Sequence, residues 1–153
     1  MAIDKVREYF RTFHIEDRII EFDTSSATVE LASKALHTDS DRIAKTLSFL
    51  VDEKPIVIVM TGDTRIDNHK FKSYFHTKAK LISPDKVESI IGHGIGGVCP
   101  FAVNNNVTVY LDVSLKKFDT VFPACGSSNS AIELTIEELE KYSHYKDWID
   151  IGK

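Results

Sequence analysis

The chain has 153 residues, of which 42% are hydrophobic and 27% are charged, a composition typical of a single globular domain rather than a disordered chain. The net charge of −4 argues against a protein that coats nucleic acid, and two cysteines are too few for a disulfide framework or a cysteine-based metal site. The longest apolar run, residues 56–60, is too short to cross a membrane, and charges near the N-terminus argue against a signal peptide. We therefore expect a cytoplasmic protein that holds no metal and does not enter a membrane.

The first part of the chain predicts two helices separated by a short strand. Apolar residues recur at helical spacing over residues 3–13, which indicates an amphipathic helix. Residues 18–22 form a short β-like run. Thr28 is expected to cap a second helix, with Glu30 in its first turn near the positive end of the helix dipole.

Two apolar runs then predict an antiparallel hairpin. Residues 45–51 and 55–61 have strand character, and the polar residues 52–54 between them are enough only for a turn. A connection this short cannot carry a parallel crossover.

Two helices are expected after the hairpin. Residues 68–75 form a basic helical segment. Ser83 followed by Pro84 is typical of a helix start, with the serine as N-cap and the proline in the first turn, and this helix should run to about Ile91.

A glycine-rich segment, residues 92–100, follows and should be a loop, because four glycines in six residues support neither a helix nor a strand. Successive N–H groups in such a loop can form a cradle for an anion or an oxyanion. The segment lacks the Gly-Lys-Ser/Thr ending of a nucleotide phosphate loop, and no strand precedes it as in a dinucleotide-binding motif. A purely structural turn remains the alternative.

The last third predicts further strands and one helix. Three runs rich in β-branched, aromatic and other apolar residues predict strands over residues 107–111, 118–122 and 130–134. Thr135 and Glu138 form a capping-box pattern that begins a helix ending near His144. The fold class is therefore α+β, a single domain with a largely antiparallel or mixed sheet flanked by helices.

Lys45 is a candidate binding residue because it begins an otherwise apolar strand. A lysine at that place can hold a phosphate or carboxyl oxygen in a pocket at the end of the sheet, although an exposed lysine at a strand end is the alternative. Cys99, with His93 six residues earlier, offers a second possibility, a thiolate nucleophile. The remaining histidines are scattered without metal-ligand spacing.

The charge distribution adds one basic stretch, residues 65–80, with a local charge of +4. It contains five cations and one anion, namely Arg65, Lys70, Lys72, Lys78, Lys80 and Asp67. It is a candidate for contact with nucleic-acid phosphates, and a solvated helix face is the alternative. The hydroxyl-rich turn at residues 126–129 could line a pocket or simply connect two strands.

These segments together resemble a known family. The motifs are Ile-Ala-Lys-Thr-Leu at residues 43–47, Gly-Asp-Thr-Arg-Ile-Asp at 62–67, Gly-Gly-Val-Cys-Pro-Phe at 96–101 and Gly-Ser-Ser-Asn at 126–129. In order and spacing they resemble the YbaK/EbsC/ProX-like aminoacyl-tRNA editing domains, over roughly residues 3–143 of a single domain 1–153. The resemblance implies a curved, barrel-like mixed sheet and a hydrolase that cleaves a wrong amino acid from the 3′-terminal adenosine of tRNA.

The resemblance also implies roles for individual residues. Lys45 would position the substrate, and the backbone of the loop that contains Gly96, Gly97 and Pro100 would hold the ester carbonyl and the terminal ribose. The expected substrate-binding residues are Thr46, Val98, Cys99, Phe101, Gly126, Ser127, Ser128 and Asn129. Arg65, Lys70 and Lys72 would contact tRNA phosphates, water would attack the ester, and neither a metal nor another cofactor would take part.

The resemblance leaves the partner and the substrate partly open. Some relatives are domains of prolyl-tRNA synthetase, whereas this chain resembles a free-standing form that binds the tRNA acceptor end, with or without a synthetase partner. The last motif lacks the Gly-Lys-Arg-Gly of relatives that clear cysteine, so tRNA(Pro) carrying alanine or another small amino acid is as well supported as cysteine. Ala102 follows Phe101, where relatives commonly have glycine. The alternatives are a non-catalytic binder of aminoacyl-tRNA ends and a hydrolase that depends on Cys99.

Overall fold

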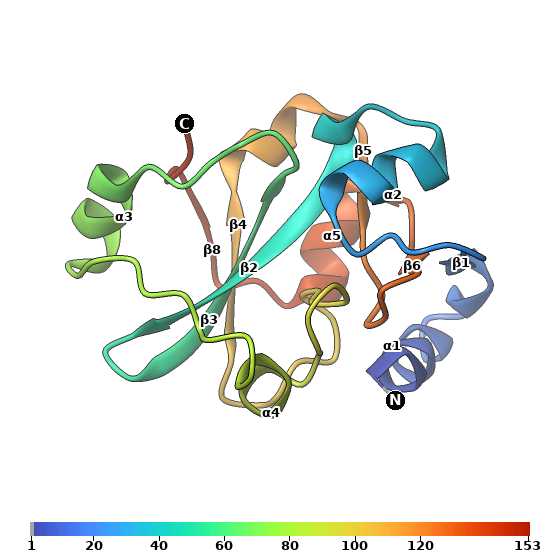
Figure 1. Ribbon diagram of the computed structural model, residues 1–153, viewed down its shortest axis with the longest axis horizontal. Coiled ribbons are helices and arrows are strands. Elements are labelled where there is room, and N and C mark those ends of the chain that lie inside the picture. Colours follow the sequence, from blue (N-terminus) through green and yellow to red (C-terminus); the bar gives the residue numbers. More distant parts are fainter. Residues whose placement is uncertain (1) are drawn as a thin grey trace.

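A six-stranded mixed sheet organises the computed structural model, which describes residues 2–153 (Figure 1). Its strands, in the order β7-β5-β2-β3-β4-β8, are β7 (Leu134–Thr135), β5 (Thr120–Pro123), β2 (Ile43–Val51), β3 (Lys54–Thr61), β4 (Thr108–Asp112) and β8 (Asp147–Ile149). A separate antiparallel pair joins β1 (Ile20–Glu21) to β6 (Ser130–Ala131). Met1, part of the expected domain 1–153, lies outside the described residues.

Five α-helices flank the sheet within residues 2–153: α1 (Ala2–Arg11), α2 (Val29–Leu36), α3 (Asn68–Phe75), α4 (Val87–Ile91) and α5 (Ile136–Ser143). Three short 3₁₀ turns lie at Glu16–Arg18, Ser40–Arg42 and Val113–Lys117. The α+β, single-domain prediction is confirmed, and the sheet curls into a half-barrel (Figure 1).

The predicted β2–β3 hairpin is confirmed, with eight residue pairs in antiparallel register. Asp52 and Glu53 turn the chain with φ values of 51° and 67°, the left-handed geometry that a two-residue hairpin loop favours. The β3–β4, β2–β5 and β4–β8 pairs are parallel, whereas β2–β3 and β5–β7 are antiparallel. The sheet is therefore mixed and not largely antiparallel, because long segments with helices separate β3 from β4 and allow a parallel return.

The helix starts follow the sequence signals at two of three places. Thr28 Oγ1 accepts a hydrogen bond from the N–H of Leu31 at 3.1 Å and so caps α2. Thr135 and Glu138 form the predicted capping box of α5. The predicted Ser83 cap is wrong, since residues 84–86 form a turn and α4 begins at Val87.

Two strand predictions need correction, and one further strand was not predicted. The predicted strand 18–22 shortens to β1, because residues 16–18 coil into a 3₁₀ turn. The predicted strand 130–134 splits into β6 and β7, since Ile132 between them donates its N–H to Pro123 O at 3.0 Å. Strand β8 has no counterpart among the sequence predictions.

The two faces of the sheet bury different helices. Helices α1, α4 and α5 pack on the face that carries Val57 and Val59. Helix α3 packs on the other face through Phe71, against Ile58. Helix α2 covers the start of β2, where Ala32 contacts the buried Ile43 and Phe122. This leaves one end of β2 between α2 and the glycine-rich loop.

Candidate functional site

A cavity of about 330 Å³ lies at that end of β2. Its walls come from residues 26–29 and α2, from residues 43–48 of β2, from β5 and β6, and from the glycine-rich loop. Among the predicted site residues it is lined by Lys45, Thr46, Gly96 and Val98. The two features that the sequence singled out as separate candidates thus face one cavity, whose walls are otherwise mostly apolar.

Lys45 is the cation of this cavity. Its side chain is half-buried, and Nζ donates a hydrogen bond to the main-chain oxygen of Gly62 at 3.1 Å. Burial lowers the pKa of Lys45, and the nearby Asp63 and Asp41 carboxylates oppose this shift while Arg65 adds to it. An ammonium with a neutral carbonyl as its hydrogen-bond partner keeps its charge available for a ligand anion or carbonyl.

The segment whose carbonyl binds Lys45, at Gly62 and Asp63, is held in place by its packing against Ser40 and Val29. A Cβ on Gly62 would lie 2.1 Å from Ser40 O and 2.7 Å from Val29 Cγ1, so glycine is required there. Ser40 Oγ donates to Asp63 Oδ1 at 2.7 Å. The Gly-Asp motif therefore packs against the 3₁₀ turn before β2 and presents its carbonyl to Lys45.

Along the glycine-rich loop, residues that line the cavity alternate with residues that are buried in the interior. Gly96, with φ of 84°, lines the cavity, and a Cβ there would lie 2.9 Å from Ala27 Cβ. Gly97 is buried, and a Cβ on it would lie 2.6 Å from Gly126 C and from Ser127 N. The two glycine motifs therefore pack backbone against backbone.

The second motif, residues 126–129, supports the rim of the cavity and does not line it. Ser128 O accepts hydrogen bonds from the N–H and the hydroxyl of Ser26, at 2.6 and 3.3 Å. Asn129 exchanges hydrogen bonds with the main chain of Phe22 at 2.8 and 3.0 Å. In the described conformation Gly126, Ser127, Ser128 and Asn129 thus order the segment before α2 and take no direct part in the cavity wall.

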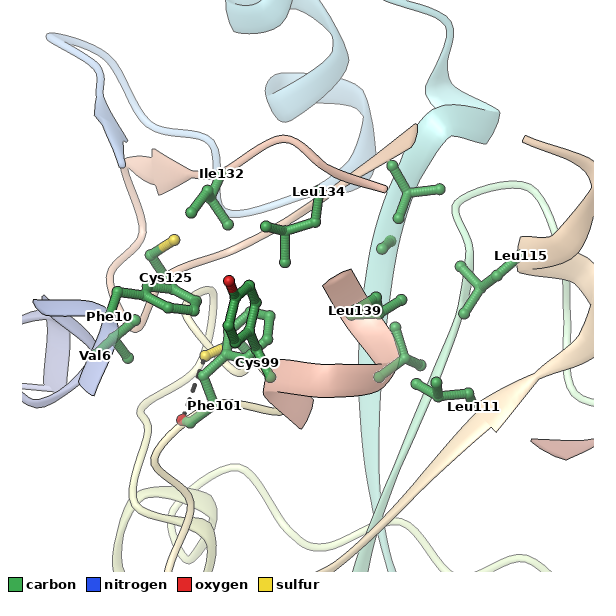
Figure 2. Packing of buried hydrophobic residues seen from close by; sticks show 14 residues of the cluster. Val6, Phe10, Cys99, Phe101, Leu111, Leu115, Cys125, Ile132, Leu134 and Leu139 are labelled. Atoms are coloured by element: carbon green, nitrogen blue, oxygen red, sulfur yellow. Dashed lines mark hydrogen bonds between the residues drawn. The ribbon is translucent and has the colours of Figure 1, made fainter. Parts of the chain in front are cut away.

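Cys99 does not belong to the site, which corrects two predictions. Figure 2 shows its sulfur among Val6, Phe10 and Phe101 in the core, where the side chain is fully buried. Burial raises the pKa of the thiol to about 12. Pro100 and Phe101 are also buried and do not line the cavity.

The histidine near Cys99 cannot serve as its base. His93 Nε2 lies 2.6 Å from the main-chain oxygen of Phe101 and 3.5 Å from Cys99 Sγ. A carbonyl oxygen can only accept a hydrogen bond, so Nε2 carries the proton, and burial lowers the pKa of His93. The burial of Cys99 and its raised pKa therefore argue against a hydrolase that depends on this thiol.

The basic stretch is not one surface. Lys70 Nζ donates to Gly152 O at 2.8 Å and pairs with Asp150 at 3.2 Å, so its charge holds the C-terminal segment. Lys72 is exposed on α3. Arg65 is exposed, and its charge acts on Lys45. Of the three residues predicted to contact phosphate, Arg65 is the one whose charge acts on Lys45 in the cavity.

Residues 2–153 contain no group of three or more His, Cys, Asp or Glu side chains that could hold a metal ion. None of the helices in this range is long and apolar enough to cross a membrane.

Comparison with known proteins decides the family. A model of the aminoacyl-tRNA editing domain matches residues 23–142. The chain belongs to this family. The resemblance recognised from the motifs is thereby confirmed, and the matched range of the editing domain contains Lys45 and both glycine motifs.

The chain is also similar to individual proteins. The uncharacterized protein YwhH of Bacillus subtilis (strain 168) is 51% identical, over 100% of this chain and 98% of YwhH. Proline–tRNA ligase of Lactiplantibacillus plantarum is 22% identical over 81% of this chain, which spans only 22% of that synthetase. A solved structure named as a candidate trans-editing enzyme for prolyl-tRNA synthetase superposes with a TM-score of 0.88 at 23% identity, covering 99% of this chain and 97% of the other.

Several cavity residues of the editing domain were not predicted from the sequence. Ser26 lines it from the segment before α2, Ile43 from β2 and Phe122 from β5. The exposed Leu81 and Ile95 line it as well. The one usable signal was the Ser-Ser-Ala-Thr run ahead of α2, which places small residues beside the helix start.

Proposed function

We propose that the protein is a free-standing hydrolase of carboxylic esters that edits in trans, removing a small amino acid such as alanine or cysteine from mischarged tRNA, with tRNA(Pro) as the expected carrier. The observation that supports this most is that Lys45 and the glycine-rich loop of an editing domain line the same cavity. The proposal takes residues 1–153 as one YbaK-like editing domain that works in the cytoplasm. Its partner is the tRNA acceptor end, with a synthetase as an optional second partner.

The chemistry asked of such a site is modest. An aminoacyl ester is already activated, so positioning the ester for attack by water and stabilising one developing oxyanion supply most of the acceleration. Lys45 would hold the carbonyl or the terminal phosphate, and main-chain N–H groups around Gly96 would face the oxyanion. The cavity volume of about 330 Å³ is at the small end for ligand pockets, which favours a small aminoacyl group over a bulky one.

A deacylation panel tests the proposal. Purified protein is incubated with alanyl-, cysteinyl-, seryl- and threonyl-tRNA, and release of the amino acid is followed. We expect one or two small amino acids to be released, and we expect Lys45→Ala to lower kcat/KM by about 100-fold without loss of the folded state. Lys54→Ala, which removes an exposed lysine at the other end of the hairpin, is the matched control and should keep full activity.

The panel also separates this proposal from its rival. Tight binding of an aminoacyl-tRNA with no release of amino acid would make the protein a binder of tRNA ends and overturn the deacylase proposal. Full activity in Lys45→Ala would remove Lys45 from the mechanism.

A further inference from the structure

One short stretch of the sheet edge at the cavity has no strand beside it. Strand β5 pairs with β2 only at Ile43 and Ala44. Further along the same edge, Ser48 O accepts from Ile82 N at 3.1 Å and Leu50 N donates to Lys80 O at 3.0 Å. The cavity lies between these two contacts.

Thr46 occupies the middle of this gap. In a strand, every second residue directs its N–H and C=O to the same edge. Since Ser48 and Leu50 face the outer edge, Thr46 does so as well, and its main-chain groups have no strand partner there. The cavity therefore has an N–H and a C=O of β2 in its wall.

The side chain of Thr46 adds a second unsatisfied group. Its Oγ1 is buried and has no hydrogen-bond partner within residues 2–153. Three other hydroxyls of the cavity wall are engaged, since Ser26 bonds to Ser128 O, Thr28 caps α2, and Ser130 bonds to Ser127. Natural proteins rarely leave a buried hydroxyl unpaired, and such a group at a cavity points to a ligand that satisfies it.

The chemical class of the ligand group follows from the charges. Adjacent residues of a strand point to opposite faces, so Thr46 and Lys45 reach the cavity from opposite sides of β2. A cationic group of the ligand avoids the Lys45 ammonium and needs oxygen acceptors. Thr46 offers two, the hydroxyl oxygen and the main-chain carbonyl.

We propose that Thr46 binds the α-amino group of the aminoacyl ester, while Lys45 faces its carbonyl or phosphate side. The inference rests on the proposed deacylase function and goes beyond it by assigning how the amino end of the substrate is recognised. It makes Thr46 the residue that distinguishes an aminoacyl group from a plain acyl group.

The test compares two esters and three variants. Hydrolysis of alanyl-tRNA is measured beside that of propionyl-tRNA, which lacks only the amino group. Thr46→Val keeps the shape and removes the hydroxyl, and we expect it to lower kcat/KM for alanyl-tRNA about tenfold while leaving propionyl-tRNA within twofold of wild type. Thr46→Ser, which keeps a hydroxyl, should recover most of the activity.

Ser143→Ala is the matched control. Ser143 Oγ is also buried without a partner in the described part of the chain, but it lies on α5 and not at the cavity. Both Thr46→Val and Ser143→Ala should unfold at the wild-type temperature or above, because each removes an unsatisfied polar group, and Ser143→Ala should keep full activity on both esters.

Each outcome is decisive. Equal losses on the two esters, or no loss in Thr46→Val, would overturn the role of Thr46 while the deacylase proposal stands. A wild-type protein that hydrolyses neither this pair nor any ester of the wider panel would overturn the deacylase proposal and this inference with it.

Discussion

Lys45 and Cys99 show how far the residues of a site can be predicted from residue type and motif alone. Both residues stand in conspicuous motifs, yet the lysine lines the cavity and the thiol lies in the core. The place of Lys45 at the start of an otherwise apolar strand made it a candidate cavity residue. Side-chain directions in a glycine-rich loop follow no regular period. The sequence therefore could not tell that Gly96 and Val98 line the cavity whereas Cys99 points into the core.

Ala102 carries a local strain that the sequence alone only suggested. Its φ of 52° lies in the left-handed region, where a Cβ costs about 1 kcal/mol and glycine costs nothing. We expect Ala102→Gly to raise the free energy of unfolding by up to about 1 kcal/mol in a denaturant titration.

Ala35→Gly, in the last turn of α2, provides the opposite control and should lower the free energy of unfolding by up to about 1 kcal/mol. A loss of stability in both variants would show that Ala102 is not strained.

Among the helices and strands, the sequence predicted an element's start correctly where the hydrogen bond that fixes it joins residues close in the chain. The Thr28 cap and the Thr135–Glu138 box each involve residues three apart, and both helices begin as expected. Strand β8 could not be foreseen, because three residues after a helix become a strand only through pairing with β4. The Ser83-Pro84 signal failed for a similar reason. Residues 84–86 form a turn, and α4 begins only at Val87, whose side chain is buried in the core.

Glu138 joins two elements that are far apart in the chain. Arg18, at the end of the first 3₁₀ turn, binds both of its carboxylate oxygens at 2.6 and 3.0 Å. This ion pair, together with the hydrogen bond from Thr135 N–H, lowers the pKa of Glu138 to about 2, despite some desolvation. The carboxylate therefore binds α5 to the segment that follows α1.

The depressed pKa predicts a pH dependence of stability. A carboxyl group whose pKa is lower in the folded than in the unfolded protein contributes stability that is complete above about pH 4.5 and is lost as the pH falls through about 2. We expect Glu138→Gln to unfold more easily than wild type at neutral pH, with the difference shrinking toward pH 2 in acid-titration melts. Glu137→Gln, an exposed carboxyl one residue earlier, is the control. A difference that is the same at every pH would contradict the ion-pair explanation.

Across the whole molecule, the charge distribution limits how tRNA can be held. The net charge is −4, and Lys70 is occupied by the C-terminal segment. Of the three predicted phosphate-binding residues, the exposed Arg65 and Lys72 therefore remain. The acidic chain is consistent with a grip on one end of the tRNA through few contacts.

Few phosphate contacts predict a weak response to salt. With two contacts, kcat/KM for aminoacyl-tRNA should fall roughly tenfold between about 50 and 200 mM salt. Lys72→Ala should flatten this slope, whereas Lys70→Ala should leave the slope unchanged and lower the unfolding temperature. A 3′-aminoacyl adenosine without phosphates serves as the control and should show little response. A fall of a thousandfold for tRNA would require a much larger basic surface than the described residues provide.

The packing of Gly97 against Gly126 and Ser127 has a consequence for protein engineering. Because these backbones touch without intervening side chains, neither loop can be lengthened or exchanged while the other keeps its place. Grafting the second motif from a relative of different substrate preference would therefore displace the first. A successful graft would therefore exchange both loops together.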